Sequence, residues 1–245
     1  MQRLREKVKK YLEWDEVLNA YQLSALFNER EYFVSCYYEN NNVGIIAFYK
    51  LANALTFRGS YKALLKILPM LRNHKGFSCY AILTQDLNLV RKHLSITRVI
   101  YEILMVLTEN NFKSVIKHDV KVLNLDNYDE IRRYYFSAFS SINELEYLLS
   151  TNRVYASLTQ EGEVASIAYI QDVTNKVAMI GGVYTRDDLR RRGYARSCLS
   201  YMINKLFHRF KYVGLLVEED NYKAINLYKS LGFKPYSRLV YFEIK

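Results

Sequence analysis

One segment of the chain, residues 177–217, constrains the fold more than any other. An apolar run from Val177 to Thr185 contains a Gly-Gly pair and predicts a strand. After an arginine-rich turn, apolar residues recur at helical spacing: Leu199, Met202, Ile203, Leu206, Phe207 and Phe210. This stripe predicts a helix over 193–210, and a second apolar run, Tyr212–Val217, predicts the next strand. Two strands joined by such a helix must run parallel in one sheet.

The turn before the predicted helix has the properties of an anion site. A helix N-terminus offers unpaired N–H groups and the positive end of the helix dipole. Gly193 lets the backbone approach a bulky anion, and Ala195 keeps the same face small. A solvated basic turn is the alternative. We predict a phosphate site built from the backbone N–H groups of Arg191, Arg192, Gly193, Tyr194, Ala195 and Arg196. The side chains of Arg190, Arg191, Arg192 and Arg196 would add positive charge.

Two motifs in this region resemble those of one enzyme family. The spacing Arg190-x-x-Gly193-x-Ala195 is similar to the acyl-CoA signature of the GNAT superfamily of N-acyltransferases. Downstream, Asn221-x-x-Ala224-x-x-Leu227-Tyr228-x-x-x-Gly232-Phe233 resembles the helix that follows the fifth strand of that family. The resemblance covers about residues 113–245. It implies an α+β fold with a mixed, mostly antiparallel sheet, splayed between its fourth and fifth strands and flanked by helices.

The resemblance also implies an activity, the transfer of an acetyl group from acetyl-CoA to an amine. The amine could belong to a small molecule, an amino acid or a protein N-terminus, and no metal is implied. The strand backbone at Val183, Tyr184 and Thr185 would hold the pantetheine arm, and Asn221 and Ala224 would also lie on the cofactor. Tyr228 would return a proton to the CoA thiolate. Since Tyr228 shares a helical face with Leu227 and Leu231, a core tyrosine is the alternative, and Asn221 could equally cap its helix.

The general base is less clearly marked, because Lys176–Tyr184 contains no carboxylate. Glu218 and Glu219, just past the fifth strand, are the nearest acidic candidates, and Tyr184 acting through water is another. The missing carboxylate keeps a second hypothesis open, a non-catalytic acyl-CoA-binding or scaffold protein of GNAT fold. In the family the first two helices line the acceptor side; the matching candidates, which could also form an aromatic core, are Arg132, Tyr135, Phe136 and Phe139.

The N-terminal half repeats the order of elements predicted for the C-terminal half. Both read strand, strand, helix, strand, helix, strand, over 43–107 and over 164–244. We therefore predict two domains, a degenerate GNAT-like domain at 1–112 and a catalytic domain at 113–245. The turn Arg58-Gly59-Ser60 lacks the full signature, so the first domain is not expected to bind CoA.

Composition limits the remaining classes of function. Half of the 245 residues are hydrophobic, which is ample for packed cores, and the net charge of +10 suits a basic surface or a polyanionic ligand such as CoA. Nucleic acid is not expected as a partner, since a basic tail and zinc-ligand spacing are both missing. Three widely spaced cysteines predict no disulfide framework. With no apolar run long enough for a bilayer, we expect no membrane partner and a cytoplasmic location.

Overall fold

The structure, a computed structural model, describes residues 2–28, 30–72 and 76–245. The first residue of the predicted 1–112 domain thus lies outside the described residues, as do residues 29 and 73–75. The chain forms two compact units. Unit 1 consists of Met1–Leu104, Leu216–Asp220 and Tyr236–Lys245, and unit 2 consists of Met105–Leu215 and Asn221–Pro235. The division into a domain at 1–112 and a domain at 113–245 stays a prediction.

Unit 1 contains the element order predicted for the N-terminal half. Its helices and strands are α1 (Gln2–Leu12), α2 (Ala20–Phe27), β1 (Tyr32–Glu39), β2 (Asn42–Tyr49), β3 (Ala54–Gly59), α3 (Tyr61–Ile67), β4 (Ser78–Leu83), α4 (Leu87–His93) and β5 (Ile96–Thr108). Short 3-10 helices lie at Glu13–Asp15, Leu68–Leu71 and Thr84–Asp86. The turn at Asn40–Asn41 uses two residues with positive φ, which closes the tight β1–β2 hairpin.

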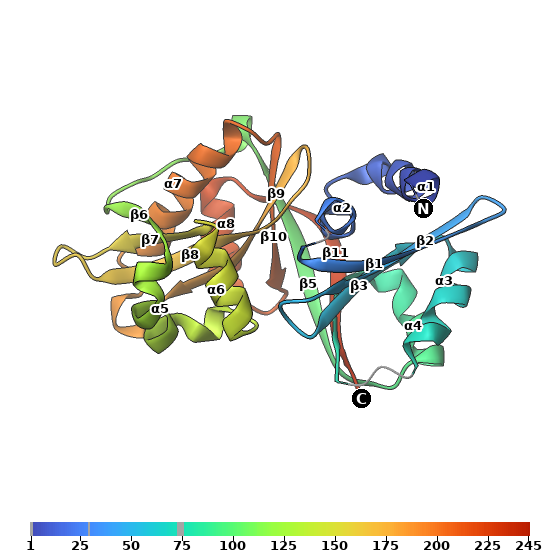
Figure 1. Ribbon diagram of the computed structural model, residues 1–245. Coiled ribbons are helices and arrows are strands. Elements are labelled where there is room, and N and C mark those ends of the chain that lie inside the picture. The colour runs from blue at the N-terminus through green and yellow to red at the C-terminus, as the bar shows by residue number, and fades with distance from the viewer. Residues whose placement is uncertain (1, 29, 73–75) are drawn as a thin grey trace. The chain divides into compact units, whose positions relative to one another are not determined.

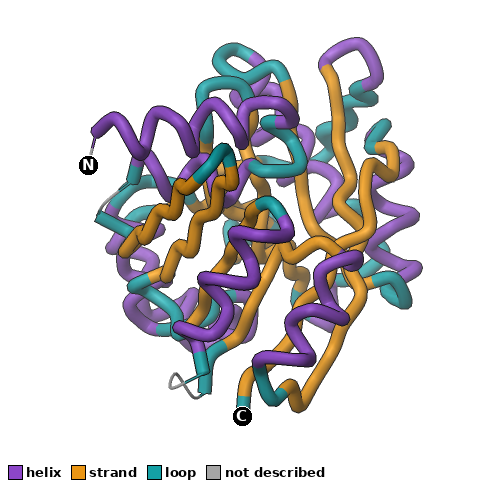
Figure 2. Tube along the Cα trace, turned by 90° about the vertical axis from the view of Figure 1, so that its right-hand side faces the viewer, coloured by secondary structure: helices purple, strands orange, loops and turns teal. Residues whose placement is uncertain are grey.

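The strands of unit 1 are covered by helices on both faces (Figures 1 and 2). Alternate residues of β2 explain this, because Val43 and Ile45 pack with α1 and α2, whereas Ile46 and Phe48 pack in the core that contains α3 and α4. Antiparallel pairing runs from β1 through β2 to β3, and β3 pairs parallel with β4.

The β3–β4 ladder of unit 1 is short. It includes only Ala54 with Ser78 and Leu55 with Cys79. Beyond it the buried Arg58 side chain, 2% exposed, reaches from β3 to β4, where Nη2 donates to the Ala81 carbonyl at 3.0 Å. A guanidinium therefore lies between these two strands beyond the end of their ladder.

The end of the chain completes the sheet of unit 1. Strand β11 (Lys234–Ile244) pairs antiparallel with β4, with Leu239 opposite Leu83 and Val240 opposite Ile82. Val240 and Phe242 are fully buried in the same core as α3 and α4. Some 150 residues of sequence separate these paired strands, so this pairing is not visible in any local pattern.

Unit 2 contains the elements predicted for the C-terminal half. They are β6 (Val120–Leu123), α5 (Tyr128–Tyr135), α6 (Ile142–Ser150), β7 (Val154–Leu158), β8 (Val164–Val173), β9 (Val177–Thr185), α7 (Tyr194–Phe207), β10 (Tyr212–Glu218) and α8 (Tyr222–Leu231), with the last residues of β10 assigned to unit 1. Short 3-10 helices lie at Glu109–Asn111, Leu125–Asn127, Phe136–Ala138 and Asp187–Leu189.

The strand order β10-β9-β8-β7-β6 gives unit 2 a mixed sheet, antiparallel throughout except for the parallel β9–β10 pair. Helices α5 and α6 cover one face, and α7 packs on the other face against β7, β8 and β9 (Figure 1). The Ser141 hydroxyl caps α6 by accepting from the Glu144 N–H at 3.0 Å, as its sequence suggests. The predicted GNAT fold, a mixed and mostly antiparallel sheet flanked by helices, is therefore confirmed for unit 2. Helix α7 ends at Phe207 rather than Phe210, and in the turn that follows the Leu206 carbonyl accepts from both the Arg209 N–H and the Phe210 N–H.

In the part of the chain that the structure describes, no helix is both long and apolar enough to cross a membrane.

Candidate functional site

Strand β9 is distorted where its Gly-Gly pair lies. Pairing with β8 runs from Val173–Ala178 to Thr185, but it shifts register between Ile167 and Tyr169. Gly182 has φ +56, and a Cβ at this position would overlap the Tyr169 ring. Glycine is needed here for two reasons, the left-handed backbone and the ring directly against it. The bulge takes residues 182 and 183 out of the ladder with β8.

The same segment of β9 is free along its other edge. The parallel ladder with β10 runs from Val177–Tyr212 to Ile180–Leu215 and stops there. Beyond Ile180, Gly181, Tyr184 and Thr185 of β9 pair with β8, Gly182 and Val183 lie in the bulge, and none of these five residues pairs with β10. An unpaired strand edge presents N–H and C=O groups that can bond an extended ligand, as in strand addition.

The arginine-rich turn ends at the N-terminus of α7, as predicted. Arg191 has φ +64 and Gly193 has φ +91, so the chain makes two left-handed steps before the helix. The Ser197 N–H donates to the Gly193 carbonyl at 3.0 Å, which leaves the earlier N–H groups of the first turn without an intrahelical partner. A Cβ on Gly193 would find its nearest neighbour, the His118 ring, at 3.7 Å. A side chain at this position would therefore contact the His118 ring without a clash, and the unpaired N–H groups of the turn fit a phosphate.

A segment that sequence reasoning missed holds this turn in place. The His118 ring donates from Nε2 to the Arg192 carbonyl at 2.9 Å and packs on the Tyr194 ring with centroids 4.0 Å apart. The Lys117 N–H donates to the Ser197 hydroxyl at 3.0 Å. A single histidine next to a predicted strand gave no signal for this role, since the contact joins residues some 75 positions apart.

The predicted arginines divide into two pairs. Arg190 is held by Asp187, with 2.5 Å between Nη2 and Oδ1, and Arg196 donates to the Ser230 hydroxyl at 2.6 Å. Arg191 and Arg192 are exposed, and neither makes a salt bridge with any residue that the structure describes. These two side chains are the ones with charge available for an anion.

Helix α8 is capped at both ends by residues of the second motif. The Asn221 side chain accepts from the Ala224 N–H at 3.2 Å, so the capping alternative for Asn221 holds. Gly232 ends the helix with φ +104, and a Cβ there would overlap the Asn111 carbonyl. Both caps fix the position of α8 in unit 2.

Tyr228 lies on the buried side of α8. Its side chain is 6% exposed, and its ring packs against Phe233 with centroids 5.9 Å apart. Burial raises the pKa of the Tyr228 phenol above its ordinary value. The group is therefore protonated at neutral pH, which suits a proton donor and excludes a role as a resting base.

The two carboxylates predicted as candidate general bases, Glu218 and Glu219, belong to unit 1 and differ in their surroundings. Arg238 binds the Glu219 carboxylate with both nitrogens of one guanidinium edge, at 2.5 and 2.8 Å, and lowers its pKa. Glu218, the last residue of β10, is exposed. Glu219 is thus a poor proton acceptor, and Glu218 is the better of the two candidates.

The helices expected to line an acceptor site are only partly available for that role. Tyr135 and Phe139 are core residues, and the Tyr135 hydroxyl donates to the Val164 carbonyl at 2.5 Å. Arg132 and Phe136 are exposed. For Tyr135 and Phe139 the core alternative is therefore correct.

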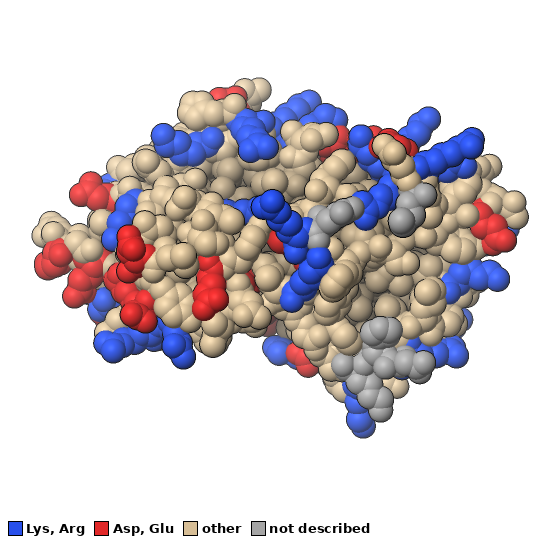
Figure 3. All heavy atoms as spheres, in the orientation of Figure 1, with Lys and Arg blue, Asp and Glu red and all other residues tan. Residues whose placement is uncertain are grey.

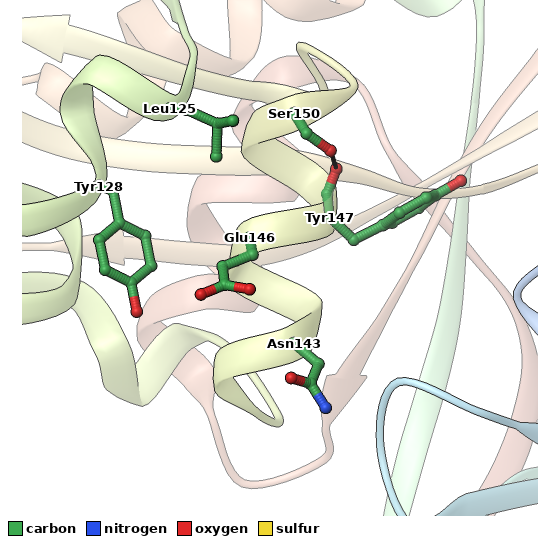
Figure 4. Close-up of a pocket in the computed structure, with 6 residues that line it drawn as sticks. All are labelled: Leu125, Tyr128, Asn143, Glu146, Tyr147 and Ser150. Atoms are coloured by element: carbon green, nitrogen blue, oxygen red, sulfur yellow. Dashed lines mark hydrogen bonds between the residues drawn. The ribbon is translucent and has the colours of Figure 1, made fainter.

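A surface pocket of about 620 Å³ lies between α5 and α6 (Figure 4). Its lining residues are Leu125, Tyr128, Asn143, Glu146, Tyr147 and Ser150. Carboxylates gather over α5 and α6 on the face of unit 2 that Figure 3 shows. Helix α5 carries Asp129 and Glu130, and Glu146 of α6 lines the pocket. None of the sequence-predicted site residues lines this pocket, and its charge disfavours the phosphates of CoA.

The family of the C-terminal part follows from a match to a family model. Residues 124–233 match the acetyltransferase (GNAT) family, so this part of the chain is a GNAT acetyltransferase domain. No curated protein sequence matches the chain. The described residues contain no group of three or more His, Cys, Asp or Glu that could hold a metal ion.

Solved structures show the same fold at low identity. A Drosophila protein is similar over 99% of this chain and 89% of its own, with 13% identity and a TM-score of 0.73. A GCN5-related N-acetyltransferase from Kribbella flavida covers 91% of this chain and 95% of its own, with 13% identity and a TM-score of 0.63. A tandem GNAT protein from the clavulanic acid biosynthesis pathway covers 97% and 94%, with 11% identity and a TM-score of 0.63. The similarity to the tandem protein supports a two-domain arrangement.

Proposed function

We propose that this protein is an N-acetyltransferase that moves an acetyl group from acetyl-CoA to an amine. The observation that carries the proposal is the combination, within unit 2, of an open helix N-terminus at Gly193 and a β9 edge that β10 leaves unpaired. The first feature fits a pyrophosphate and the second fits the amide-bearing pantetheine arm. Membership of residues 124–233 in the GNAT acetyltransferase family supports the same donor.

Each part of the donor has a proposed partner. The backbone of Arg191–Arg196 binds the pyrophosphate, and Arg191 and Arg192 add charge, while Arg190 and Arg196 brace the turn. The backbone of Val183–Thr185 bonds the pantetheine amides, and one of its N–H groups polarises the thioester carbonyl. Asn221 and Ala224 lie at the start of α8 and contact the cofactor, as the resemblance to the family implies.

Acyl transfer also needs an acid and a base. Tyr228 gives a proton to the departing thiolate, a role supported by its protonated state. Of the two predicted bases, Glu218 is preferred over Glu219, since Arg238 holds the latter as a carboxylate.

The wider proposal has three further parts. Residues 1–112 form a GNAT-like domain without its own CoA site, supported by Arg58 between β3 and β4. A cytoplasmic location is supported by three free cysteines. The partners are acetyl-CoA and an amine acceptor. A non-catalytic acyl-CoA-binding protein is the second candidate, favoured by the lack of a carboxylate on β9.

Replacement of Gly193 tests the donor site. We expect acetyl-CoA or CoA at about a thousand times its dissociation constant to add roughly 4 kcal/mol to the free energy of unfolding, read as a thermal shift. ATP should give a smaller shift. Gly193→Glu should abolish both CoA shifts, because a carboxylate would stand where the pyrophosphate binds.

Gly162→Glu is the matched control. Gly162 has φ +84 in an exposed turn with no atom within 4 Å of a Cβ, so it imposes the same backbone strain away from the site. It should keep the CoA shift. Equal affinity in Gly193→Glu would rule out the phosphate site, and CoA binding without amine-dependent thiol release would favour the non-catalytic candidate.

A further inference from the structure

An irregular segment of unit 2, residues 112–118, is held against helix α7 by buried hydroxyl groups. The Val115 N–H donates to the Ser200 hydroxyl, and the Lys117 N–H donates to the Ser197 hydroxyl, each at 3.0 Å. The two donors are alternate residues, as in an extended chain, and the two serines are one turn apart on α7. Both serines are at most 1% exposed. Their hydroxyls therefore serve to guide the 112–118 segment towards the N-terminus of α7.

The last residue of this segment, His118, contacts the arginine-rich turn in two ways. Its Nε2 lies 2.9 Å from the Arg192 carbonyl oxygen, and because a carbonyl only accepts, Nε2 carries the proton. The ring also packs on the Tyr194 ring, with centroids 4.0 Å apart and planes 31° apart. Tyr194 is buried at the start of α7. The imidazole is therefore fixed both by its ring and by its N–H.

This hydrogen bond sets the orientation of the peptide bond between Arg192 and Gly193. The C=O and the N–H of a trans peptide point in opposite directions. Since the Arg192 carbonyl points at His118, the Gly193 N–H points away from it. This N–H finds no acceptor among the residues that the structure describes. Glycine tolerates either orientation of the peptide before it, so the glycine itself does not select this one.

The Gly193 N–H begins the row of free N–H groups at the start of α7. The Ser197 N–H is the first in the helix with a partner, the Gly193 carbonyl, so the N–H groups of residues 194–196 are free of intrahelical bonds. Positive φ at Arg191 and Gly193 curls the preceding backbone, and successive N–H groups in such a turn form a concave anion site. A flipped 192–193 peptide would present a carbonyl oxygen there and repel the anion.

We propose that His118 is a positioning residue of the donor site: it holds the 192–193 peptide so that the Gly193 N–H, and not the Arg192 carbonyl, faces the pyrophosphate of acetyl-CoA. The inference rests on the proposed function. It assigns to the 112–118 segment a role in binding the pyrophosphate and none in binding the pantetheine arm, which is proposed to lie on the β9 backbone. A merely structural role of the ring would affect both parts of the donor alike.

The test separates the N–H of His118 from its ring. His118→Phe keeps a ring against Tyr194 and removes the donor, whereas His118→Gln keeps an N–H donor of similar reach and removes the ring. Calorimetry gives the Kd of acetyl-CoA for each variant. We expect His118→Phe to raise this Kd about 10- to 100-fold, because a hydrogen bond to a charged group is lost with the peptide orientation. His118→Gln should stay within about fivefold of wild type.

S-acetylpantetheine is the second ligand, because it carries the acylated arm without the pyrophosphate. Its Kd, measured by NMR titration, should agree within about twofold between wild type and both variants, since no hydrogen bond to its groups is changed. His208→Phe is the matched control. His208 is exposed just beyond the other end of α7, so this variant should bind both ligands as wild type does.

Three results overturn the inference. Wild-type affinity for acetyl-CoA in His118→Phe removes His118 from the donor site and leaves the proposed function standing. An equal loss in the Phe and Gln variants, or a loss that extends to S-acetylpantetheine, shows that the ring or the fold is responsible. A wild type that binds neither acetyl-CoA nor CoA removes the donor site and the proposed function with it.

Ser197→Ala is a second variant, for use if thermal melting shows that His118→Phe is unfolded. It removes the acceptor of the Lys117 N–H and leaves His118 itself in place. We expect a loss of affinity for acetyl-CoA of about three- to tenfold, with S-acetylpantetheine unchanged, because the segment that delivers His118 loses one hydrogen bond. An unchanged affinity for acetyl-CoA in this variant overturns the role of the 112–118 segment.

Discussion

Burial raises the pKa of the Tyr228 phenol, so the group is protonated at neutral pH both as a core residue and as a catalytic acid. A core tyrosine and a catalytic acid occupy the same face of α8, so the position of the residue alone does not distinguish them. Loss of the hydroxyl distinguishes the two roles, because a thiolate leaving group needs its proton and the packing of the ring does not.

Tyr228→Phe removes only the hydroxyl and keeps the contact with Phe233. We expect kcat to fall by about 10² or more, with the Kd for acetyl-CoA nearly unchanged. Single-turnover thiol release and calorimetry measure the two quantities. Tyr222→Phe, on the same helix and 70% exposed, is the control and should behave as wild type. Full activity in Tyr228→Phe would show that water or another group protonates the thiolate.

At the scale of the element, strand β9 depends on one glycine for its shape. The bulge at Gly182 exists because Tyr169 fills the space that a side chain would need, and Tyr169 is itself fixed by a hydrogen bond to the Ala138 carbonyl at 3.2 Å. The free edge of β9 and the packing of α5 and α6 are thus linked through one ring.

Gly182→Ala tests this link by urea unfolding. The positive φ alone should cost about 1 kcal/mol, and overlap with the Tyr169 ring should add about 1–3 kcal/mol. Gly162→Ala, with a similar φ and open space, measures the backbone part alone. Equal losses in the two variants would show that the ring moves aside freely and does not set the bulge.

At the scale of the whole molecule, the two halves of the sequence do not correspond to the two compact units. Unit 1 needs residues 236–245 for its core, since Val240, Phe242 and Ile244 are buried there beside β4. We therefore expect residues 1–112 and residues 113–245 each to be unfolded or aggregated when expressed alone. Circular dichroism and size-exclusion chromatography of the fragments, against the full chain, test this. A monomeric, cooperatively melting 113–245 fragment would contradict it.

Local patterns predicted most elements of this fold and the acetyl-CoA side of the candidate site. The stripe from Leu199 to Phe207, the caps at Asn221 and Gly232, and the turn at Gly193 are all properties of neighbouring residues. What could not be predicted depends on distant partners. The pairing of β11 with β4 and the hydrogen bond from His118 to the Arg192 carbonyl both join residues far apart in sequence.

The pairing of β11 with β4 also sets an order of events during synthesis. Domains made first usually fold first, while the rest of the chain is still being translated. Here β1 to β4 of unit 1 leave the ribosome early, yet their sheet lacks its β11 partner until residues 234–244 have been made. The apolar surface that Phe242 covers must wait through the translation of nearly all of unit 2. The part of the protein that is made first is therefore finished last, and it is the part with the greatest need of chaperone protection in the cell.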